Sequence, residues 1–225
     1  MFQVSDAWKG AFPDAHAGVL VMSNVTNPAR HPELDREKAL VENQLRARFS
    51  GQDRSAIEAL PIIQAYNAYY KRFKKTYHVQ LQLESIAFKG KSLPSVAALV
   101  EAMFMAEVKN MLLTAGHDMD ALELPITLDV ATGAERYVLL RGQEQPLKPG
   151  DMMMADRRGI ISSILYGPDQ RTQIRDRTQR VVFTVYAPAG IDEPVVQAHL
   201  LDIQKNVQLV APQAQVESLD VWGSK

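Results

Sequence analysis

Hydrophobic positions recur with a helical period through the first half of the chain. A short β-branched run at 18–22 predicts an early strand, and leucines set among alternating charges over 33–49 predict a solvent-exposed helix. A second helix is predicted over 55–74, with Pro61 either kinking it or marking its start. A third is predicted to begin near Ser95.

After residue 117 the pattern changes to short apolar segments separated by turn residues, which is typical of strands. A helix capped by Asp192 and a last strand follow. The predicted strands are 126–130, 136–140, 152–155, 160–164, 181–186 and 216–221. Helices first, a compact sheet next and one late helix predict an α+β fold with a mostly antiparallel sheet and packed helices.

Composition places the chain among ordinary globular proteins. Its 225 residues are 46% hydrophobic and 23% charged, which excludes collagen-like, disordered and membrane-spanning classes. We expect one domain with a helical part at about 30–92, a sheet-rich part at about 93–190 and a final helix and strand at about 191–222. The absence of cysteine excludes disulfides and thiolate chemistry. With no apolar signal segment near the N-terminus, we expect a cytoplasmic protein without a membrane partner.

The formal net charge of −1 hides a separation of signs along the chain. Residues 30–91 hold 12 Lys and Arg against 7 Asp and Glu, a net charge of +5. Residues 141–180 hold 8 against 5, a net charge of +3, and the remaining segments are acidic. Two basic blocks therefore make a polyanion partner worth testing.

The strongest basic signal is the segment 69–75, which packs four cations and three aromatics into seven residues. Aromatics interleaved with Lys and Arg can stack on bases while the cations neutralise phosphates. The alternative is that the aromatics form a core stripe of a helix while the cations face water. The candidate RNA-binding cations of this block are Lys71, Arg72, Lys74, Lys75, Lys89 and Lys91.

Two further polar clusters are candidates for chemistry. The segment 171–180 holds four arginines that can fork onto phosphates or a carboxylate, or can form a charged loop with local Asp176 pairs. The segment 117–120 places an imidazole and two carboxylates at a predicted helix end, as a cation site, a general base, or a solvated loop in which Asp118 caps the next turn. We predict no metal site and no cofactor, because phosphate-cradling glycine loops, nucleophile elbows and His-x-x-x-His pairs are absent from the sequence.

Several segments, in order, resemble the B3/B4 domain, the tRNA-binding and editing module of the phenylalanyl-tRNA synthetase β subunit, and its stand-alone relatives. They are the helix start at 94–101, the strand at 126–131, the strand ending in Asp at 149–156, and the Arg171-Thr172-x-Ile174-x-x-x-Thr178 signature. The resemblance implies a sheet-rich, sandwich-like core with packed helices and an RNA partner.

The departures from the family concern its editing site. In an ungapped alignment the family's Asn falls on Phe104, its editing His on Ala115 and its last pocket Glu on Thr184, so the same hydrolytic mechanism is not expected. The residues that remain in the pocket region implied by the resemblance are Asp118, Asp156, Ser162, Ser163, Arg171, Thr172 and Thr178.

Three functions stay open at the level of sequence. The first is a stand-alone tRNA- or RNA-binding protein that uses the basic block near Lys71 to Lys91 and the arginines of 171–180. The second is an aminoacyl-tRNA deacylase acting in trans with a changed amino-acid specificity. The third is a small-molecule domain for an amino-acid-like ligand whose carboxylate pairs with Arg171. Catalytic residues, the particular RNA or amino acid and the oligomeric state are left open.

Overall fold

The computed structural model describes residues 2–224. Its helices are α1 (Asp6–Ala11), α2 (Pro32–Arg48), α3 (Arg54–Glu58), α4 (Pro61–Lys71), α5 (His78–Lys89), α6 (Ala98–Asn110) and α7 (Glu193–Val210), with a short 3-10 turn η1 (Met119–Ala121). Its strands are β1 (Phe2–Val4), β2 (His16–Ser23), β3 (Thr114–Asp118), β4 (Ile126–Val130), β5 (Arg136–Val138), β6 (Glu144–Pro146), β7 (Met152–Asp156), β8 (Gly159–Ser163), β9 (Gly167–Pro168), β10 (Arg180–Ala187) and β11 (Gln215–Gly223).

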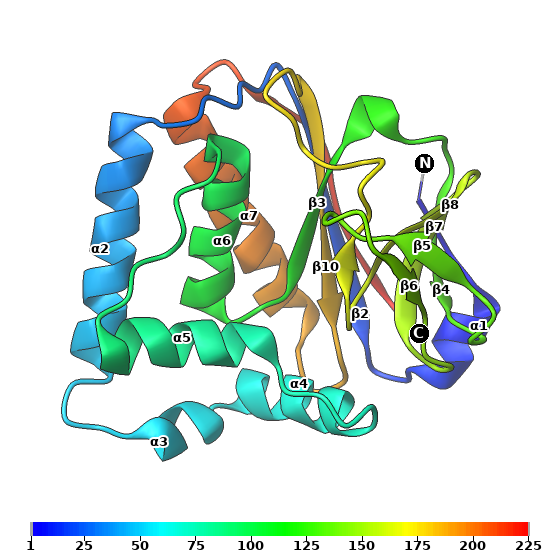
Figure 1. The fold of residues 1–225 in the computed structure, drawn as a ribbon, viewed down its shortest axis with the longest axis horizontal. Coiled ribbons are helices and arrows are strands. Elements are labelled where there is room, and N and C mark those ends of the chain that lie inside the picture. The colour runs from blue at the N-terminus through cyan, green and yellow to red at the C-terminus, as the bar shows by residue number, and fades with distance from the viewer. Residues whose placement is uncertain (1, 225) are drawn as a thin grey trace.

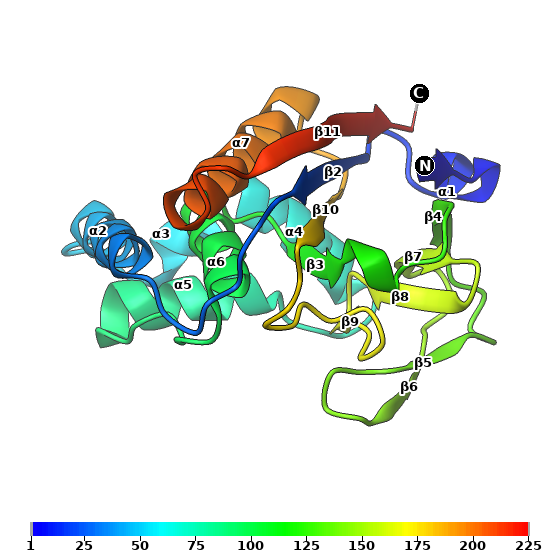
Figure 2. The same cartoon turned by 90° about the horizontal axis from the view of Figure 1, so that it is seen from above.

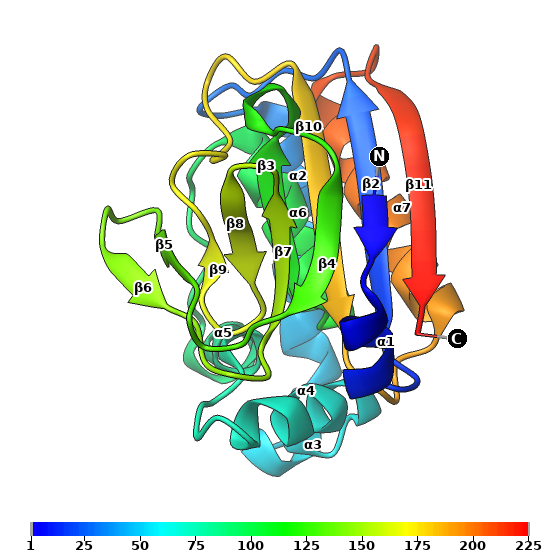
Figure 3. The same cartoon turned by 90° about the vertical axis from the view of Figure 1, so that its right-hand side faces the viewer.

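These elements form three layers (Figure 1). Helices α6 and α7 cover one face of a four-stranded sheet of order β11-β2-β10-β3, and α2 packs against these two helices on the side away from the strands. A five-stranded sheet of order β1-β4-β7-β8-β9 lies across the other face (Figures 2 and 3), and β5 and β6 form a separate hairpin. Among the described strands β1 and β4 pair in parallel, and the other pairs are antiparallel. The predicted α+β class with a mostly antiparallel sheet is confirmed.

The central strands are buried on both faces because a layer covers each side of the sheet. Six consecutive residues of β2 are buried, and so is all of β10 after its first residue. Gly18 on β2 lets α7 approach the sheet closely, since a Cβ there would lie 2.6 Å from Val196 Cγ1. The predicted core strand 152–154 is likewise buried, with its three methionines between 1% and 6% exposed.

Pro61 divides the predicted helix over 55–74 into α3 and α4, because it begins α4 at the first helical turn. The aromatics of α4 and the turn that follows are buried, with Tyr66, Tyr70 and Phe73 at 0%, 1% and 8% exposure. Lys71 and Lys74 beside them are exposed. The core-stripe alternative is therefore confirmed, and these rings are not available to stack on bases.

The sequence prediction was wrong about the residues around His117. They form β3, which pairs with β10, rather than the end of a helix. The short elements β1, α1, β6 and β9 were not predicted. Within residues 2–224 no helix has both the length and the apolarity needed to cross a membrane.

Candidate functional site

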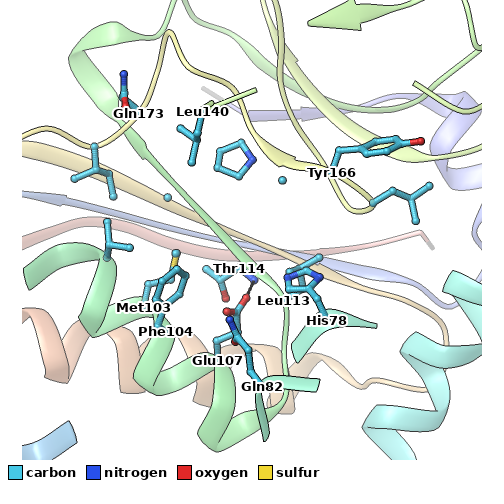
Figure 4. Close-up of a pocket in the computed structure, with 16 residues that line it drawn as sticks. His78, Gln82, Met103, Phe104, Glu107, Leu113, Thr114, Leu140, Tyr166 and Gln173 are labelled. Atoms are coloured by element: carbon cyan, nitrogen blue, oxygen red, sulfur yellow. Dashed lines mark hydrogen bonds between the residues drawn. The ribbon is translucent and has the colours of Figure 1, made fainter. Parts of the chain in front are cut away.

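A cavity of about 430 Å³ opens between α5, α6, β3 and the connections on either side of β9 (Figure 4). Its walls are mainly apolar, which suits an apolar or aromatic group. The apolar side chains lining it are Val100, Met103, Phe104, Leu113, Leu140, Leu165, Pro168 and Ile174.

The helical side of the cavity carries His78, Gln82 and Glu107, across from Tyr166 and Gln173 (Figure 4). Glu107 on α6 is 2% exposed and accepts a hydrogen bond of 2.9 Å from the Thr114 backbone N–H. Burial raises the pKa of the Glu107 carboxyl to about 8, so it carries a proton at neutral pH and can donate a hydrogen bond. Gln82 Oε1 on α5 is buried and has no hydrogen-bond partner among the described residues. Glu107 thus offers a donor to a ligand and Gln82 offers an acceptor.

The mouth of the cavity adjoins the lysine-rich segment. His78, the first residue of α5, and Tyr166, after β8, both line the cavity. Lys75 Nζ lies 4.4 Å from the centroid of the Tyr166 ring, a cation–π contact. With Lys71, Lys75 also lines a polar groove along α4 and α5. Lys75 therefore connects the groove, which it lines, to the cavity, which Tyr166 lines.

The six candidate RNA-binding cations fall into two groups. Lys71, Arg72, Lys74 and Lys75 lie between α4 and the start of α5, where the Arg72 guanidinium lies 5.5 Å from the Tyr69 ring centroid. Lys89 and Lys91 lie at the far end of α5, about 18 Å away along a helix of 12 residues. Sequence proximity suggested one surface, and the helix between the groups separates them.

None of the seven residues expected in the ligand pocket lines the cavity. Arg171 forms a two-pronged ion pair with Asp156, with both N···O distances 2.8 Å, and also donates to the Ala121 carbonyl at 3.0 Å. Burial alone would raise the pKa of Asp156, but hydrogen bonds from Arg171 and from the Glu123 and Arg158 backbone hold it below its usual range. This clamp connects the β7–β8 turn to η1 and to the loop 169–179.

The remaining expected residues also make internal contacts. Thr172 Oγ1 contacts Asp169 and lies 2.7 Å from His117 Nδ1, and Thr178 donates to Asp118 at 2.8 Å. The serines are held within β8, where Ser162 Oγ lies 2.5 Å from the Tyr186 hydroxyl and Ser163 Oγ accepts from the Tyr166 backbone. The threonine bonds fix the loop 169–179 against β3.

The residues at 117–120 are used within the fold. His117 is fully buried, and burial lowers its pKa to about 3, so it stays neutral. Asp118 accepts from the Asp120 backbone N–H at 3.1 Å, which confirms the capping alternative. Across residues 2–224 there is no group of three or more His, Asp or Glu side chains placed to hold a metal ion.

The positions aligned with the family's editing groups divide between two sides of β3. Phe104 lines the cavity. Ala115 lies between Thr114 and Gly116, which both line the cavity, so its side chain faces the opposite side of the strand. It pairs in register with Thr184 on β10. Of the three aligned positions only Phe104 lines the cavity, so the polar groups of the cavity come from other positions in the sequence.

Sequence reasoning missed these polar groups, which are His78, Gln82, Glu107 and Thr114. One signal was present for Glu107, because it follows the apolar run 102–106 in the middle of a helix, where a buried carboxyl needs a reason. No local signal marked Gln82, since its environment comes from the packing of α5 against α6 and not from its neighbours in the sequence.

The comparisons with known proteins point to one family. The profile of the B3/4 domain matches residues 64–196, more than half of the chain. The phenylalanine–tRNA ligase β subunit of Mycoplasma pneumoniae (strain ATCC 29342 / M129 / Subtype 1) is 32% identical over 69 residues, which are 31% of this chain and 9% of that subunit.

A solved N-terminal fragment of the phenylalanyl-tRNA synthetase β subunit from Pyrococcus horikoshii aligns with 98% of this chain and 50% of its own, at 11% identity and a TM-score of 0.48. The chain therefore spans a small part of the curated subunit that it matches and half of the solved fragment. From the profile match, we conclude that this chain belongs to the B3/4 domain family.

Proposed function

We propose that this protein binds tRNA, with backbone phosphates on the lysine strip, defined as Lys71, Lys74 and Lys75, and the aminoacyl group of a charged 3′ end in the cavity. The observation that carries the proposal is the junction at Lys75. This residue lines the polar groove and contacts Tyr166 at the mouth of the cavity. The charged 3′ end of a tRNA has the matching order, because its phosphates are followed by an amino-acid ester.

The lysine strip suits phosphate binding because its charges are not neutralised. None of the three lysines forms an ion pair with a carboxylate in the part of the chain that the structure describes. The polar groove also carries amide and hydroxyl groups from Asn67 and Thr76 that can bond to phosphate or ribose oxygens. Arg72 differs, since its guanidinium lies against Phe12, Tyr69 and Phe73.

The cavity suits the aminoacyl group because of its size and the placement of its polar groups. Its volume of about 430 Å³ lies within the range of small-ligand sites, and its walls are apolar. The protonated Glu107 and the unpaired Gln82 oxygen add one donor and one acceptor for a polar group on the ligand.

The test is a tRNA-binding titration at several salt concentrations, with uncharged and aminoacylated tRNA. The Lys71→Glu/Lys75→Glu variant should bind at least about 10-fold more weakly at low salt, with a slope of log K against log salt shallower by about 1.4. Arg36→Glu/Lys205→Glu is the matched control, because it makes the same charge change at exposed sites on α2 and α7. Equal weakening in both variants would reject the lysine strip. Equal affinity for charged and uncharged tRNA would reject the cavity as the aminoacyl site.

Lys89 and Lys91 form a separate patch at the end of α5, where Arg46 donates to the Lys91 carbonyl at 3.2 Å. Within this proposal they contact RNA only if the tRNA extends along the whole helix. A Lys89→Glu/Lys91→Glu variant measures this directly. An unchanged salt slope would confine the RNA to the lysine strip.

A second candidate function is hydrolysis of the aminoacyl ester. The titrating carboxyl of Glu107 inside the cavity favours it, because a group with a pKa of about 8 can exchange a proton near neutral pH. Release of an amino acid from a panel of charged tRNAs, abolished in Glu107→Gln with tRNA affinity retained, would support this function. A panel hydrolysed no faster than without protein would leave binding as the function.

A further inference from the structure

Some residues of the loop 169–179 make contacts inside the protein, and others are exposed to solvent. Arg171, Thr172 and Thr178 are used in the internal contacts described above, and Ile174 reaches the cavity, where a Cβ on Gly116 would lie 2.8 Å from Ile174 Cδ1. Arg175 and Arg177, in contrast, are exposed. The loop is therefore held by its internal contacts, while these two arginines face solvent.

Three hydrogen bonds fix the backbone of Arg175. Its N–H donates to Thr178 Oγ1 at 2.9 Å, and its carbonyl accepts from Asn27 Nδ2 at 3.1 Å and from the Thr178 N–H at 3.0 Å. Asn27 and Thr178 are themselves buried. An exposed charge on such a fixed backbone loses less conformational entropy on binding than one on a mobile loop.

Arginines from two other elements lie near these two. Arg158 from the β7–β8 turn and Arg136 from β5 line a groove together with Arg171 and Arg175. An adjoining groove shares Arg158, Arg171 and Arg175 and adds Arg177. We call these two adjoining grooves together the arginine groove, and its exposed arginines are Arg136, Arg158, Arg175 and Arg177.

The carboxylates near the arginine groove leave much of its positive charge available. In the first groove the one lining carboxylate is Asp169, which is 4% exposed and held by Thr172. The adjoining groove has three lining carboxylates, Asp118, Asp120 and Glu123. Asp118 accepts from Thr178, Asp120 pairs with Arg180 at 3.2 Å, and Glu123 lies 3.6 Å from Arg158.

The arginines themselves are weakly paired. Arg136 has an exposed partner, Glu144, at 3.1 Å. Arg175 and Arg177 have no carboxylate partner among residues 2–224. Exposed pairs of this kind contribute little to stability, so a phosphate can replace the carboxylate at small cost.

The arginine groove borders the cavity on a different side from the lysine strip. Gln173 lines both the groove and the cavity, and Leu140 of the cavity follows Val138 of the groove. In Figure 4, Gln173 and Leu140 lie apart from His78, which marks the lysine side. Two cationic surfaces therefore flank one cavity.

We propose that the arginine groove is a second contact for the phosphodiester backbone of the RNA whose end enters the cavity. This inference rests on the proposed function and extends it from one side of the cavity to both. Arginine is suited to the contact because its planar guanidinium binds two phosphate oxygens at once. Arg171 is not part of the contact, since the Asp156 clamp uses its donors.

The test is an Arg158→Glu/Arg175→Glu/Arg177→Glu variant in the same tRNA titration. Its salt slope should be shallower than that of the unmodified protein by about 2, and its affinity at low salt should fall at least about 10-fold. The matched control is Lys9→Glu/Arg36→Glu/Lys205→Glu, three exposed reversals away from both surfaces. Binding by the arginine variant equal to that of the control would overturn the proposal.

Folding and the proposed function are checked separately. The three arginines are exposed, so the variant should unfold at the same urea concentration as the unmodified protein. If it does not, Arg158→Gln/Arg175→Gln/Arg177→Gln repeats the test, and an unchanged slope there overturns the proposal. Loss of affinity in the lysine variant alone rejects this inference and retains the proposed function. Absence of salt-dependent tRNA binding by the unmodified protein rejects both.

Discussion

Arg171 shows at the scale of one residue how a functional signal in sequence becomes a structural role. Its guanidinium bonds to Asp156 and to the Ala121 carbonyl, and a quarter of its side chain is exposed. Arg175, four positions later, bonds to neither and is exposed. Both are arginines of the same charged segment, and their hydrogen-bond partners distinguish them.

We therefore expect Arg171→Ala to lower the free energy of unfolding by about 2 kcal/mol, because it leaves the buried Asp156 carboxylate without its cation. The comparison is Arg175→Ala, which should stay within about 0.5 kcal/mol of the unmodified protein. Urea unfolding at pH 7 measures both. The pKa of Asp156 lies below its usual range, so the stability from this pair is present above about pH 4 and is lost as pH falls. Equal stability of the two variants would contradict the clamp.

Glu107 gives a pH prediction with the opposite sign. Its pKa is about 8 in the folded protein and about 4.3 in an unfolded chain. Between about pH 4.3 and about pH 8, the two pKa values, the folded state therefore holds a proton on Glu107 that the unfolded chain has lost. The free energy of unfolding falls as pH rises through this range. Glu107→Gln keeps an acceptor for the Thr114 N–H but does not titrate. The free energy of unfolding of Glu107→Gln, taken relative to that of the unmodified protein, should therefore rise by on the order of 3 kcal/mol between pH 4 and pH 7.

Urea unfolding at pH 4, 5, 6 and 7 tests this, with the exposed Glu193→Gln on α7 as the matched control. The free-energy difference between Glu107→Gln and the unmodified protein should change with pH by more than the difference for the control. Parallel profiles for all three proteins would show that Glu107 does not carry a raised pKa.

At the scale of elements, α4 is fixed to both sheets by tyrosine hydroxyls. Tyr66 donates to the Tyr186 carbonyl of β10 at 2.5 Å and accepts from the Leu113 N–H at 2.9 Å. Tyr70 donates to the Ile164 carbonyl after β8 at 2.6 Å. These bonds connect the helix that begins the lysine strip to the strands near the cavity.

Tyr66→Phe should lower the free energy of unfolding by about 2 kcal/mol, because it leaves a buried N–H and a buried carbonyl without a partner. Tyr166→Phe is the matched control, since the Tyr166 hydroxyl makes no hydrogen bond within the described chain. Thermal or urea unfolding distinguishes the two. A cost in Tyr66→Phe no larger than in Tyr166→Phe would contradict this role for the hydroxyl.

Most of the long elements were predictable because their patterns are local, whereas α5 was not, since the apolar residues at 83–88 fit a strand as well as a helix. The helix at 33–49 and the strands at 126–130 and 181–186 appear at nearly the predicted positions, as α2, β4 and β10. β3 was missed because its sequence, Thr-Ala-Gly-His-Asp, has no strand pattern, and pairing with β10 makes it a strand. β1 was missed for a similar reason, since it is three residues long and pairs with the distant β4.

At the scale of the whole molecule, the fold distributes the charge that the net value of −1 conceals. Cations from the two basic blocks lie on different sides of one cavity, in the lysine strip and in the arginine groove, and the fold adds Arg136 from outside these blocks to the groove. The first block is also split by α5, which puts Lys89 and Lys91 at its far end. The packing of the helices and sheets sets the positions of these charged residues, and counting charges along the chain does not reveal those positions.

The sequence by itself determined the α+β class, most of the main helices and strands, the resemblance to the B3/B4 domain and the presence of two basic blocks. Periodicity and charge are properties of neighbouring residues, so they can be seen without a structure. Only the tertiary structure decided that Glu107 and Gln82 face the cavity while Arg171 and Asp156 bind each other. Burial and the choice of hydrogen-bond partner depend on residues from distant elements, and these decide which polar groups remain free for a ligand.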